Sequence, residues 1–388
     1  MSDLTHLQHI RQELPATISH LYLNAGTFGP LPTGVIQAMQ ERKQNELRNG
    51  RLGMQAFEGI FEAYTRARNG VARLLHASEE EIALTSSTGE GMNIISYSLN
   101  WQAGDEVITT NHEHPSALGP LYQIRNRYGV VLRVADLGPQ ADRPILEAVS
   151  ELITARTRLI SISHVAWTTG ATLDIAAIGR LGRERDILVL VDGAQSAGAI
   201  PIDVKALDVD AYAIPAQKWL CGPDGAGALY VRKETIPALH PTHVGYSSAK
   251  HEQDGEWELV ASAQRFEAGT RHTTAVIGQE VALNWLEQVV GYPWIFERIA
   301  TLHTYAYHQL QKVPGLTMLT PQPGASGLIA FQLAGQDEAE VVKHLQEAHN
   351  IYIRSIPSTH ALRVSTGFYN TEEEIDTLVQ ALDTLQRS

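Results

Sequence analysis

The chain has 388 residues, a length at which two domains are more common than one hydrophobic core. Hydrophobic residues make up 44% and charged residues 19%, as in ordinary globular proteins. The formal net charge of -13 argues against nucleic acid as a partner, because a phosphate backbone is bound by basic surfaces. A single cysteine, Cys221, excludes an intrachain disulfide and a multi-cysteine metal site. The first residues lack a signal-peptide pattern and no apolar run is long enough to span a membrane, so we expect a cytoplasmic protein.

The N-terminal part of the chain predicts two helices, over 32–49 and 55–76. From about residue 80 onward, apolar runs alternate with helical stretches. The runs are 82–85, 106–110, 130–135, 158–165, 187–191, 211–214 and 227–231, and the helices between them include 115–127, 145–155 and 175–185. Several of these runs are continuous rather than alternating, which is typical of strands buried on both faces. This pattern predicts a doubly wound α/β domain with a mainly parallel sheet.

The texture of the chain changes beyond residue 260. A long helical stretch is interrupted near 291–293, and short strands and helices follow it. These elements are a helix over 275–311, strands over 327–333, 351–354 and 361–364, and helices over 337–349 and 372–385. We therefore predict a large domain over 15–260 and a smaller α+β domain over 261–388, with residues 1–14 packing on the smaller one.

Four places where a strand ends and a loop begins carry candidate chemistry, because ligands bind at the carboxyl edge of open α/β sheets. In the first, Thr88 and Gly89 open a helix whose free N–H groups suit a phosphate, although Thr88 could equally be an ordinary helix cap. In the second, Asp192 ends an apolar strand. It could bind a metal, a ribose or a ring nitrogen, or merely cap the turn that follows.

The third and fourth places hold cations. Lys218 lies in an uncharged stretch between an apolar run and a Gly/Pro-rich turn. A lysine forms a Schiff base only as the free amine, and a desolvated setting that lowers its pKa favours that form. Arg363 lies on a predicted strand of the small domain, where its guanidinium could bind a carboxylate or form a surface ion pair.

In this order, a phosphate turn, a strand-end Asp, a Schiff-base Lys and a distal Arg resemble the fold-type I pyridoxal-phosphate (PLP) enzymes. The chain resembles the class V aminotransferase group with the cysteine desulfurases, from Tyr22-Leu-Asn-Ala-Gly26 to Tyr369-Asn-Thr-Glu-Glu373. The resemblance implies a large domain with a mainly parallel, seven-stranded sheet and a smaller C-terminal domain.

The resemblance also implies roles for individual residues, with PLP as the cofactor. Thr88 and Gly89 would hold the phosphate, Asp192 would pair with the ring nitrogen, and Gln195 would bind the phenolic oxygen. His114, in His112-Glu-His-Pro-Ser116, would stack on the ring, and Lys218 would form the Schiff base and move the α-proton. The remaining implied positions are Arg363 for the substrate carboxylate, Ala25 near the substrate, and Thr270, which would reach the phosphate of a second subunit in a homodimer.

Several positions depart from the desulfurase pattern. Pro215-Ala-Gln-Lys218 replaces Ser-x-His-Lys, so that only Gln217 could still donate a hydrogen bond near the phosphate. Trp167 replaces an asparagine near the substrate. Most important, the segment that carries the desulfurase cysteine is reduced here to Ser355-Ile-Pro-Ser-Thr-His360, without a cysteine. Cys221 is interpreted as a buried structural residue.

Without a sulfur-accepting thiol, the pattern is closest to the cystine or cysteine carbon–sulfur lyases (C-DES type). We expect β-elimination from L-cystine or L-cysteine to pyruvate, ammonia and a persulfide or sulfide, and a supply of sulfur to an iron–sulfur acceptor protein. Arg354 would contact the far carboxylate of cystine, although a surface role is equally open.

Alternatives are another class V activity (a desulfurase-like enzyme, an epimerase, a transaminase or a lyase of bulkier substrates) and a non-catalytic binding protein. A metal hydrolase built on His112, His114, His240 and His243 is disfavoured by their spacing, so we expect no metal.

Overall fold

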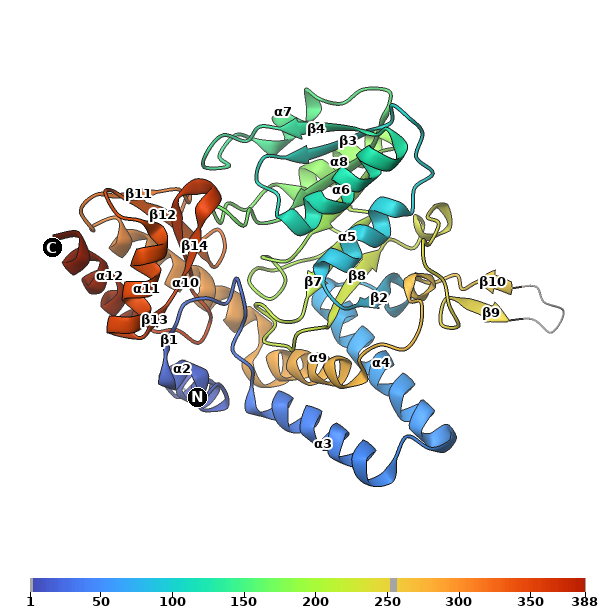
Figure 1. Ribbon diagram of the computed structural model, residues 1–388, viewed down its shortest axis with the longest axis horizontal. Coiled ribbons are helices and arrows are strands. Elements are labelled where there is room, and N and C mark those ends of the chain that lie inside the picture. Colours follow the sequence, from blue (N-terminus) through green and yellow to red (C-terminus); the bar gives the residue numbers. More distant parts are fainter. Residues whose placement is uncertain (1–2, 252–256, 388) are drawn as a thin grey trace.

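A seven-stranded sheet forms the centre of the computed structural model, which describes residues 3–251 and 257–387 (Figure 1). Its strand order is β2-β8-β7-β6-β5-β3-β4. Strands β3 to β7 are parallel, whereas β8 is antiparallel to both of its neighbours, so that β2 again runs in the direction of β7. The strands are β2 (Ile82–Thr85), β3 (Glu106–Thr110), β4 (Val131–Ala135), β5 (Thr157–Ser163), β6 (Leu188–Asp192), β7 (Ala211–Pro215) and β8 (Gly227–Val231). The predicted seven-stranded α/β architecture is confirmed, and six strands therefore end at one edge.

Helices cover both faces of this sheet because alternate side chains of its buried strands point to opposite sides. Val107 packs with helices α5 and α6, whereas its neighbour Ile108 packs with α7 and α8. These helices are α5 (Thr88–Tyr97), α6 (Pro115–Tyr128), α7 (Ile145–Ser150) and α8 (Ile175–Arg185). Each of α5 and α6 begins directly beyond a strand that ends at the shared edge, which brings its N-terminus there.

Three long helices lie side by side below the sheet in Figure 1: α3 (Thr33–Asn49), α4 (Gly53–Leu75) and α9 (Thr273–Trp285). A π-helical turn, Leu286–Val290, separates α9 from α10 (Tyr292–Leu310). Gly291, with φ of 89°, and Pro293 in the first turn of α10 end one helix and start the next, as the sequence predicts.

A four-stranded antiparallel sheet, in the order β11-β12-β15-β14, forms the core of the C-terminal part. Its elements are β11 (Leu316–Met318), β12 (Leu328–Leu333), β14 (Arg354–Ile356) and β15 (Ala361–Ser365), with α11 (Glu338–His349) and α12 (Glu372–Arg387) against it. The prediction of one strand over 351–354 is wrong. Ile351 and Tyr352 form β13, which pairs in parallel with β1 (Leu21–Tyr22), and Arg354 begins β14 in the four-stranded sheet.

In Figure 1 the N-terminal helices lie below the C-terminal part, whereas strands β9 and β10 lie at the right-hand end. The N-terminal helix α1 (Asp3–Glu13) is followed by α2 (Ala16–Ser19), and Arg11 of α1 forms an ion pair with Glu374 of α12 at 2.8 Å. Strands β9 (Ala249–His251) and β10 (Trp257–Leu259) form a separate antiparallel pair. The division near residue 260 stays a prediction. Within the described residues, no helix combines the length and apolar character that a membrane span requires.

Candidate active site

Lys218 lies just beyond β7, at the edge where the parallel strands end. Its side chain is partly accessible, and in the described part of the chain no carboxylate lies within ion-pair distance of its Nζ atom. Burial lowers the pKa of Lys218 to about 8, while Asp192 acts in the opposite direction and two arginines reinforce the lowering. A lysine with this pKa is about one-tenth free amine at pH 7, far more than an ordinary lysine, and the free amine is the form that nucleophilic and base chemistry require.

Asp192 and Gln195 lie on the turn that leaves β6, and both are buried. Asp192 Oδ1 accepts a hydrogen bond from the N–H of Ala194 at 2.8 Å, and burial raises the pKa of Asp192, opposed by Lys218. The Gln195 amide donates to the carbonyl of Gly26 at 2.8 Å and accepts from the indole N–H of Trp219 at 3.0 Å. These bonds fix the Gln195 amide and leave one of its two N–H donors for a ligand.

The N-terminal segment after β1 closes over the Lys218 turn. Gly29 donates its N–H to the carbonyl of Gln217 at 2.7 Å, and a Cβ atom at Gly29 would lie 2.0 Å from the carbonyl oxygen of Lys218. Only glycine permits this approach. The same segment contains Ala25, whose side chain is buried, and Thr27, which faces the arginines of the small domain.

The N-terminus of α5 holds an unpartnered hydroxyl. The helix cap is Ser87, whose Oγ accepts from the N–H of Glu90 at 3.2 Å, so Thr88 is not the cap that the sequence allowed. Thr88 Oγ1 is buried without a hydrogen-bond partner, and so is the side-chain oxygen of Gln217 beside Lys218. Buried polar atoms are rarely left unpaired, so these atoms mark places for ligand atoms. Thr88 and Gly89 suit a phosphate at the helix N-terminus.

His114 and Trp167 form an aromatic wall of the site. His114 caps α6 by accepting the N–H of Ser116 at its Nδ1 atom, 3.1 Å away. The two rings meet edge to face at 5.1 Å between centroids. Burial, reinforced by Lys218, lowers the pKa of His114 to about 4, which leaves the imidazole neutral at pH 7. The indole N–H of Trp167 is buried without a partner.

Arg363 is a fully buried cation on β15. Its guanidinium donates to the carbonyl of Trp167 at 3.0 Å and to the hydroxyl of Thr27 at 3.2 Å, and its Nε atom has no partner. Burial, with a contribution from Arg354, lowers the pKa of Arg363 to about 9, which still leaves it charged at pH 7. Among the described residues no acidic side chain pairs with it, although burying an unpaired charge is costly.

Arg354 lies directly opposite Arg363 on the neighbouring strand β14. Its guanidinium donates to Thr27 at 3.4 Å and lies 6.0 Å from the centre of the Trp167 ring. Like charges at facing positions of antiparallel strands repel each other. The pair therefore suits a ligand that brings two negative groups.

The link from β14 to β15 is a tight hairpin. Ser355 and Ile356 belong to β14, the residues Pro357–Thr359 form one 3-10 turn, and His360 has φ of 48°. No loop extends from this hairpin toward the site. Cys221, the single cysteine, is buried beyond Lys218, and burial raises the pKa of its thiol to about 12.

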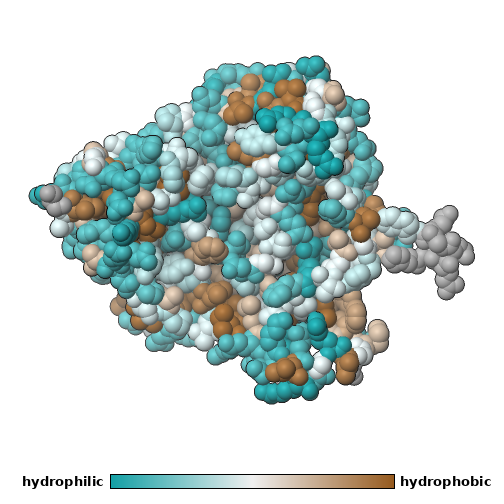
Figure 2. Space-filling view, viewed as in Figure 1, coloured by the Kyte–Doolittle hydropathy of each residue, from teal (hydrophilic) through white to brown (hydrophobic). Residues whose placement is uncertain are grey.

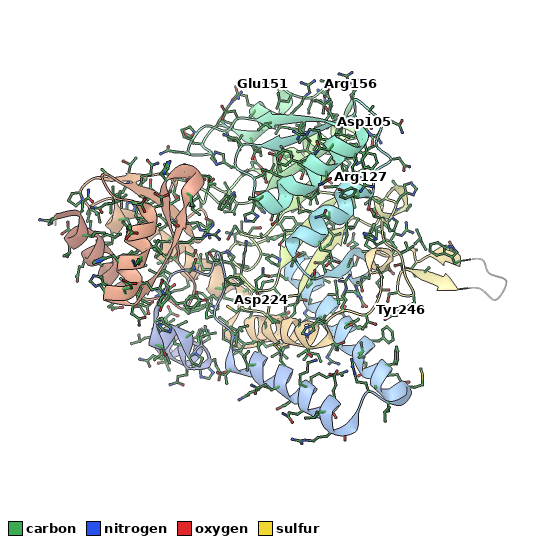
Figure 3. The ribbon with its side chains drawn as sticks, viewed as in Figure 1. Asp105, Arg127, Glu151, Arg156, Asp224 and Tyr246 are labelled. Atoms are coloured by element: carbon green, nitrogen blue, oxygen red, sulfur yellow. The ribbon has the colours of Figure 1, made fainter. Side chains whose placement is uncertain are left out.

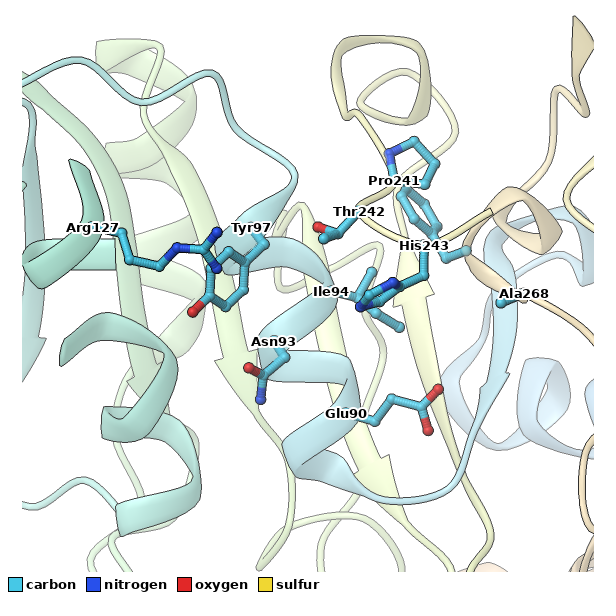
Figure 4. A pocket seen from close by; sticks show the side chains of 10 residues that line it. Glu90, Asn93, Ile94, Tyr97, Arg127, Pro241, Thr242, His243 and Ala268 are labelled. Atoms are coloured by element: carbon cyan, nitrogen blue, oxygen red, sulfur yellow. The ribbon is translucent and has the colours of Figure 1, made fainter. Parts of the chain in front are cut away.

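Thr270 lies apart from this cluster, exposed in the segment between β10 and α9. Its hydroxyl forms a hydrogen bond with that of Tyr246 at 2.5 Å. Near it, a cavity of about 730 Å³ runs along the outer side of α5 (Figure 4). This cavity is lined by Glu90, Asn93, Ile94, Tyr97, Arg127, Pro241, Thr242, His243, Phe266 and Ala268 and does not include Lys218.

His112, one histidine of the metal alternative, is held by hydrogen bonds within the chain. Both ring nitrogens of His112 are hydrogen-bonded, to the hydroxyl of Thr168 and to the carbonyl of Gly138, each at 2.7 Å. No cluster of three or more potential metal ligands occurs within residues 3–251 and 257–387. Sequence reasoning overlooked Glu113, a buried acid beside His114. Its position directly after a strand end was the available signal.

Comparisons with known proteins agree with this geometry. The aminotransferase class-V family model matches residues 21–378. A cysteine desulfurase of Escherichia coli is 32% identical over 94% of this chain and 93% of its own length. The cystine C–S lyase C-DES in complex with its reaction product, cysteine persulfide, superimposes with a TM-score of 0.91 at 28% identity, over 95% of this chain and 99% of that one. A mutant of C-DES with glycine covalently linked to its PLP cofactor gives a TM-score of 0.92 at 27% identity, over 96% and 98% of the two chains.

The fold and the site thus define an enzyme of fold-type I, the architecture of PLP-dependent catalysts. The chain belongs to the aminotransferase class-V family.

Proposed function

We propose that this PLP-dependent carbon–sulfur lyase catalyses β-elimination from L-cystine, or from L-cysteine. Cystine and water would give pyruvate, ammonia and cysteine persulfide, whereas cysteine would give sulfide in place of the persulfide. The observation that carries the proposal is the hairpin of β14 and β15. It is short, it has no cysteine, and it presents Arg354 and Arg363 without acidic partners among the described residues. When bound, PLP supplies an electron sink for negative charge at the substrate Cα.

The residues at the sheet edge suit PLP because they offer the donors and charges that this cofactor needs. The unpartnered hydroxyl of Thr88, with the N–H groups at the start of α5, would hold the phosphate. Asp192 would pair with the protonated ring nitrogen, and Gln195 would donate its free N–H to the phenolic oxygen. Further holding positions are Gly89, Gln217, the stacked ring of His114, and Thr270 from a second subunit.

Lys218 would be the covalent attachment point of the cofactor and the group that moves the substrate's α-proton. Its pKa of about 8 lies close to neutral pH, where a general base is most effective. Lys218 would take the proton from Cα and could return it to the departing product. The imidazole of His114 is neutral at this pH, so it would contribute stacking and a hydrogen-bonding nitrogen without adding a second cation beside Lys218.

The two arginines would orient the substrate. Arg363 would bind the α-carboxylate of the reacting half, and Arg354 would bind the carboxylate of the far half of cystine. Trp167 would lie between the two carboxylate ends of the substrate. Its indole N–H has no acceptor among the described residues. Ala25 would line the narrow side of the pocket. Cystine also has the better leaving group, since a persulfide anion leaves more easily than a simple thiolate.

Cysteine desulfurase chemistry lacks a nucleophile on this chain. A desulfurase passes sulfur to an enzyme thiolate, and the thiolate form is the reactive one. Cys221 is buried in an apolar setting with a pKa of about 12, so it stays a neutral thiol. This supports elimination over transfer to an enzyme cysteine.

We further propose that the enzyme is a cytoplasmic homodimer with shared active sites and that its persulfide supplies an iron–sulfur acceptor protein. Exposed Thr270 and Tyr246 would contact the second subunit's site. Apolar side chains are also exposed where α3 meets α4, the lower corner in Figure 2. They are Leu47, Leu52, Met54, Phe57 and Phe61, with exposed fractions of 78%, 80%, 71%, 52% and 46%. A cluster of this kind suits burial by a second copy.

Product analysis tests the proposal. The PLP-loaded enzyme is incubated with cystine and, separately, with cysteine, and pyruvate and alanine are quantified. Elimination predicts pyruvate and ammonia in equal amounts with both substrates. Alanine as the chief product would contradict the proposal, because alanine forms only when sulfur is removed as in a desulfurase.

A further inference from the structure

Glu113 is the one buried glutamate of the described residues without a cationic partner. The other buried carboxylates except Asp192 form ion pairs: Glu81 with Lys205, Glu106 with Arg133, Asp210 with Arg183 and Glu267 with Arg68. Buried acids are expected to be paired, so an exception calls for an explanation. For Asp192 the ring nitrogen of PLP is that explanation. Glu113 has none in the mechanism above.

Two hydroxyls hold the Glu113 carboxyl from the ends of neighbouring strands. Thr110, the last residue of β3, lies 2.7 Å from Oε1, and Ser163, the last residue of β5, lies 2.6 Å from Oε2. A hydroxyl can accept a hydrogen bond as well as donate one, so this pair of partners suits a neutral carboxylic acid. These hydrogen bonds, with one from the backbone of Ser163, lower the pKa of Glu113. Neither residue carries a charge, however, so the bonds do not offset the burial that raises this pKa.

Asp192 stands next to this clamp. Ser163 and Asp192 are direct neighbours in the parallel register of β5 and β6. Two carboxyl groups that share a buried site do not both ionise, because their like charges repel each other. Asp192 has the nearby ammonium of Lys218 to favour its charged form, whereas Glu113 has only uncharged partners, the two hydroxyls and the backbone of Ser163. Burial, with a contribution from Asp192, accordingly raises the pKa of Glu113 to about 7.

We propose that Glu113 is a positioning residue that acts as a neutral acid: it clamps the turn that carries His114, and it leaves Asp192 as the sole negative charge where β5 and β6 end. This inference rests on the PLP site proposed above.

The clamped Glu113 is adjacent to the aromatic wall formed by His114 and Trp167. His114 follows Glu113 in the chain, caps α6 through its Nδ1 atom and meets Trp167 edge to face. His112, the residue before Glu113, donates its backbone N–H to the hydroxyl of Thr110 at 3.1 Å. Releasing the Glu113 side chain would free one end of this turn, and the imidazole of His114 would lose its fixed position over the ring.

Three variants test the proposal. Glu113→Gln keeps the size of the side chain and both of its hydroxyl partners without a charge. The glutamine carbonyl would accept a hydrogen bond from Thr110, and its N–H would donate one to Ser163. We expect its PLP dissociation constant and the absorption band of the bound cofactor to match those of the wild type. Glu113→Ala loses the clamp, and we expect PLP affinity to fall roughly tenfold, the effect of leaving buried polar groups unpaired. Glu106→Gln, at the other end of β3, is the matched control and should leave both readouts unchanged.

A Glu113→Gln variant as defective as Glu113→Ala would show that the charge is needed and would overturn the proposal, and so would a Glu113→Ala variant with normal affinity. An infrared difference spectrum of wild type against Glu113→Gln tests the protonation directly. Recorded near pH 6, this spectrum should contain the carbonyl band of a protonated acid, and the absence of that band would overturn the proposal. Failure of the wild type to bind PLP would instead contradict the proposed function, and the infrared result would still be readable.

Discussion

The two edges of the central sheet treat buried charge in opposite ways. At the amino edge, Glu106 at the start of β3 pairs with Arg133 at 2.6 Å and with Arg156 at 3.4 Å, and Asp210 before β7 pairs with Arg183 at 3.1 Å. Arg156, Asp105 and Glu151 are labelled at this end of the sheet in Figure 3. Charges there are neutralised within the chain.

At the carboxyl edge the charges are left open. Lys218 and Asp192 at this edge, and Arg363 on the neighbouring four-stranded sheet, form no ion pair within residues 3–251 and 257–387, and Glu113 has only uncharged partners. The same sheet therefore carries a structural set of charges at one edge and a set that awaits ligand atoms at the other. An absent partner, rather than a charged residue as such, marks the functional edge.

The largest effect should come from Lys218→Ala. This change removes the group that moves the α-proton, so we expect turnover to fall by roughly 10³-fold or more while PLP still binds noncovalently. The rate of cystine turnover measures the loss of catalysis. Borohydride treatment, which fixes PLP only when it is bound covalently, measures the loss of the covalent attachment. Near-normal turnover would mean that another group moves the α-proton and that the carboxyl edge of the sheet is not the active site.

Arg363→Gln should separate binding from stability. We expect kcat/KM to fall by roughly 10²-fold, since a buried carboxylate contact is lost, while the free energy of unfolding stays equal or rises because an unpaired buried charge is removed. Steady-state kinetics and denaturant unfolding provide the comparison. A large loss of stability with unchanged kcat/KM would show that Arg363 is structural, like the arginines of the amino edge.

The two glutamates near the ends of β3 should respond to pH in opposite directions. The hydrogen bond from Arg133 lowers the pKa of Glu106 to about 2, so its contribution to stability is present above the unfolded pKa of about 4.3 and is lost as the pH falls toward 2. Burial raises the pKa of Glu113 to about 7, so the folded chain holds that proton more tightly. Its contribution is present below about pH 4.3 and is lost as the pH rises through 7.

Unfolding free energies of the wild type, Glu106→Gln and Glu113→Gln between pH 3 and 8 measure this difference. We expect Glu106→Gln to cost about 1–3 kcal/mol near neutral pH and progressively less in acid. The wild type should lose stability relative to Glu113→Gln between about pH 4.3 and 7. Parallel curves for the two variants would contradict the distinction between the edges.

The smallest effect should come from Cys221→Ala. Its buried thiol has no role in elimination, so we expect activity within about twofold of the wild type and a loss of about 1 kcal/mol in stability from the small cavity. Rates of pyruvate formation and unfolding curves test this. A collapse of activity at unchanged stability would restore a desulfurase mechanism.

The sequence predicts the large sheet well because its strands are continuous apolar runs buried on both faces. The strand-end position of Lys218 and Asp192 follows from the same pattern. Six short strands were missed or merged, because two or three residues are too short for any periodicity and their pairing depends on other segments: β1, β9, β10, β11, β13 and β14.

The electrostatic state of the site could not be predicted in this way. Glu113 is clamped by Ser163, 50 residues away, and Arg363 meets Thr27 at a separation of 336 residues. Whether a charged side chain is paired depends on such long-range contacts, which no local pattern contains. The sequence offers the residue types, and the fold decides which of them stay without partners.

The most direct test of the central claim compares cystine with a cystine derivative whose far carboxyl is an amide. If the open arginine pair binds two carboxylates, the wild type should prefer cystine by roughly tenfold in kcat/KM, and Arg354→Gln should abolish that preference while still acting on both compounds. An undiminished preference for cystine in Arg354→Gln would contradict the account.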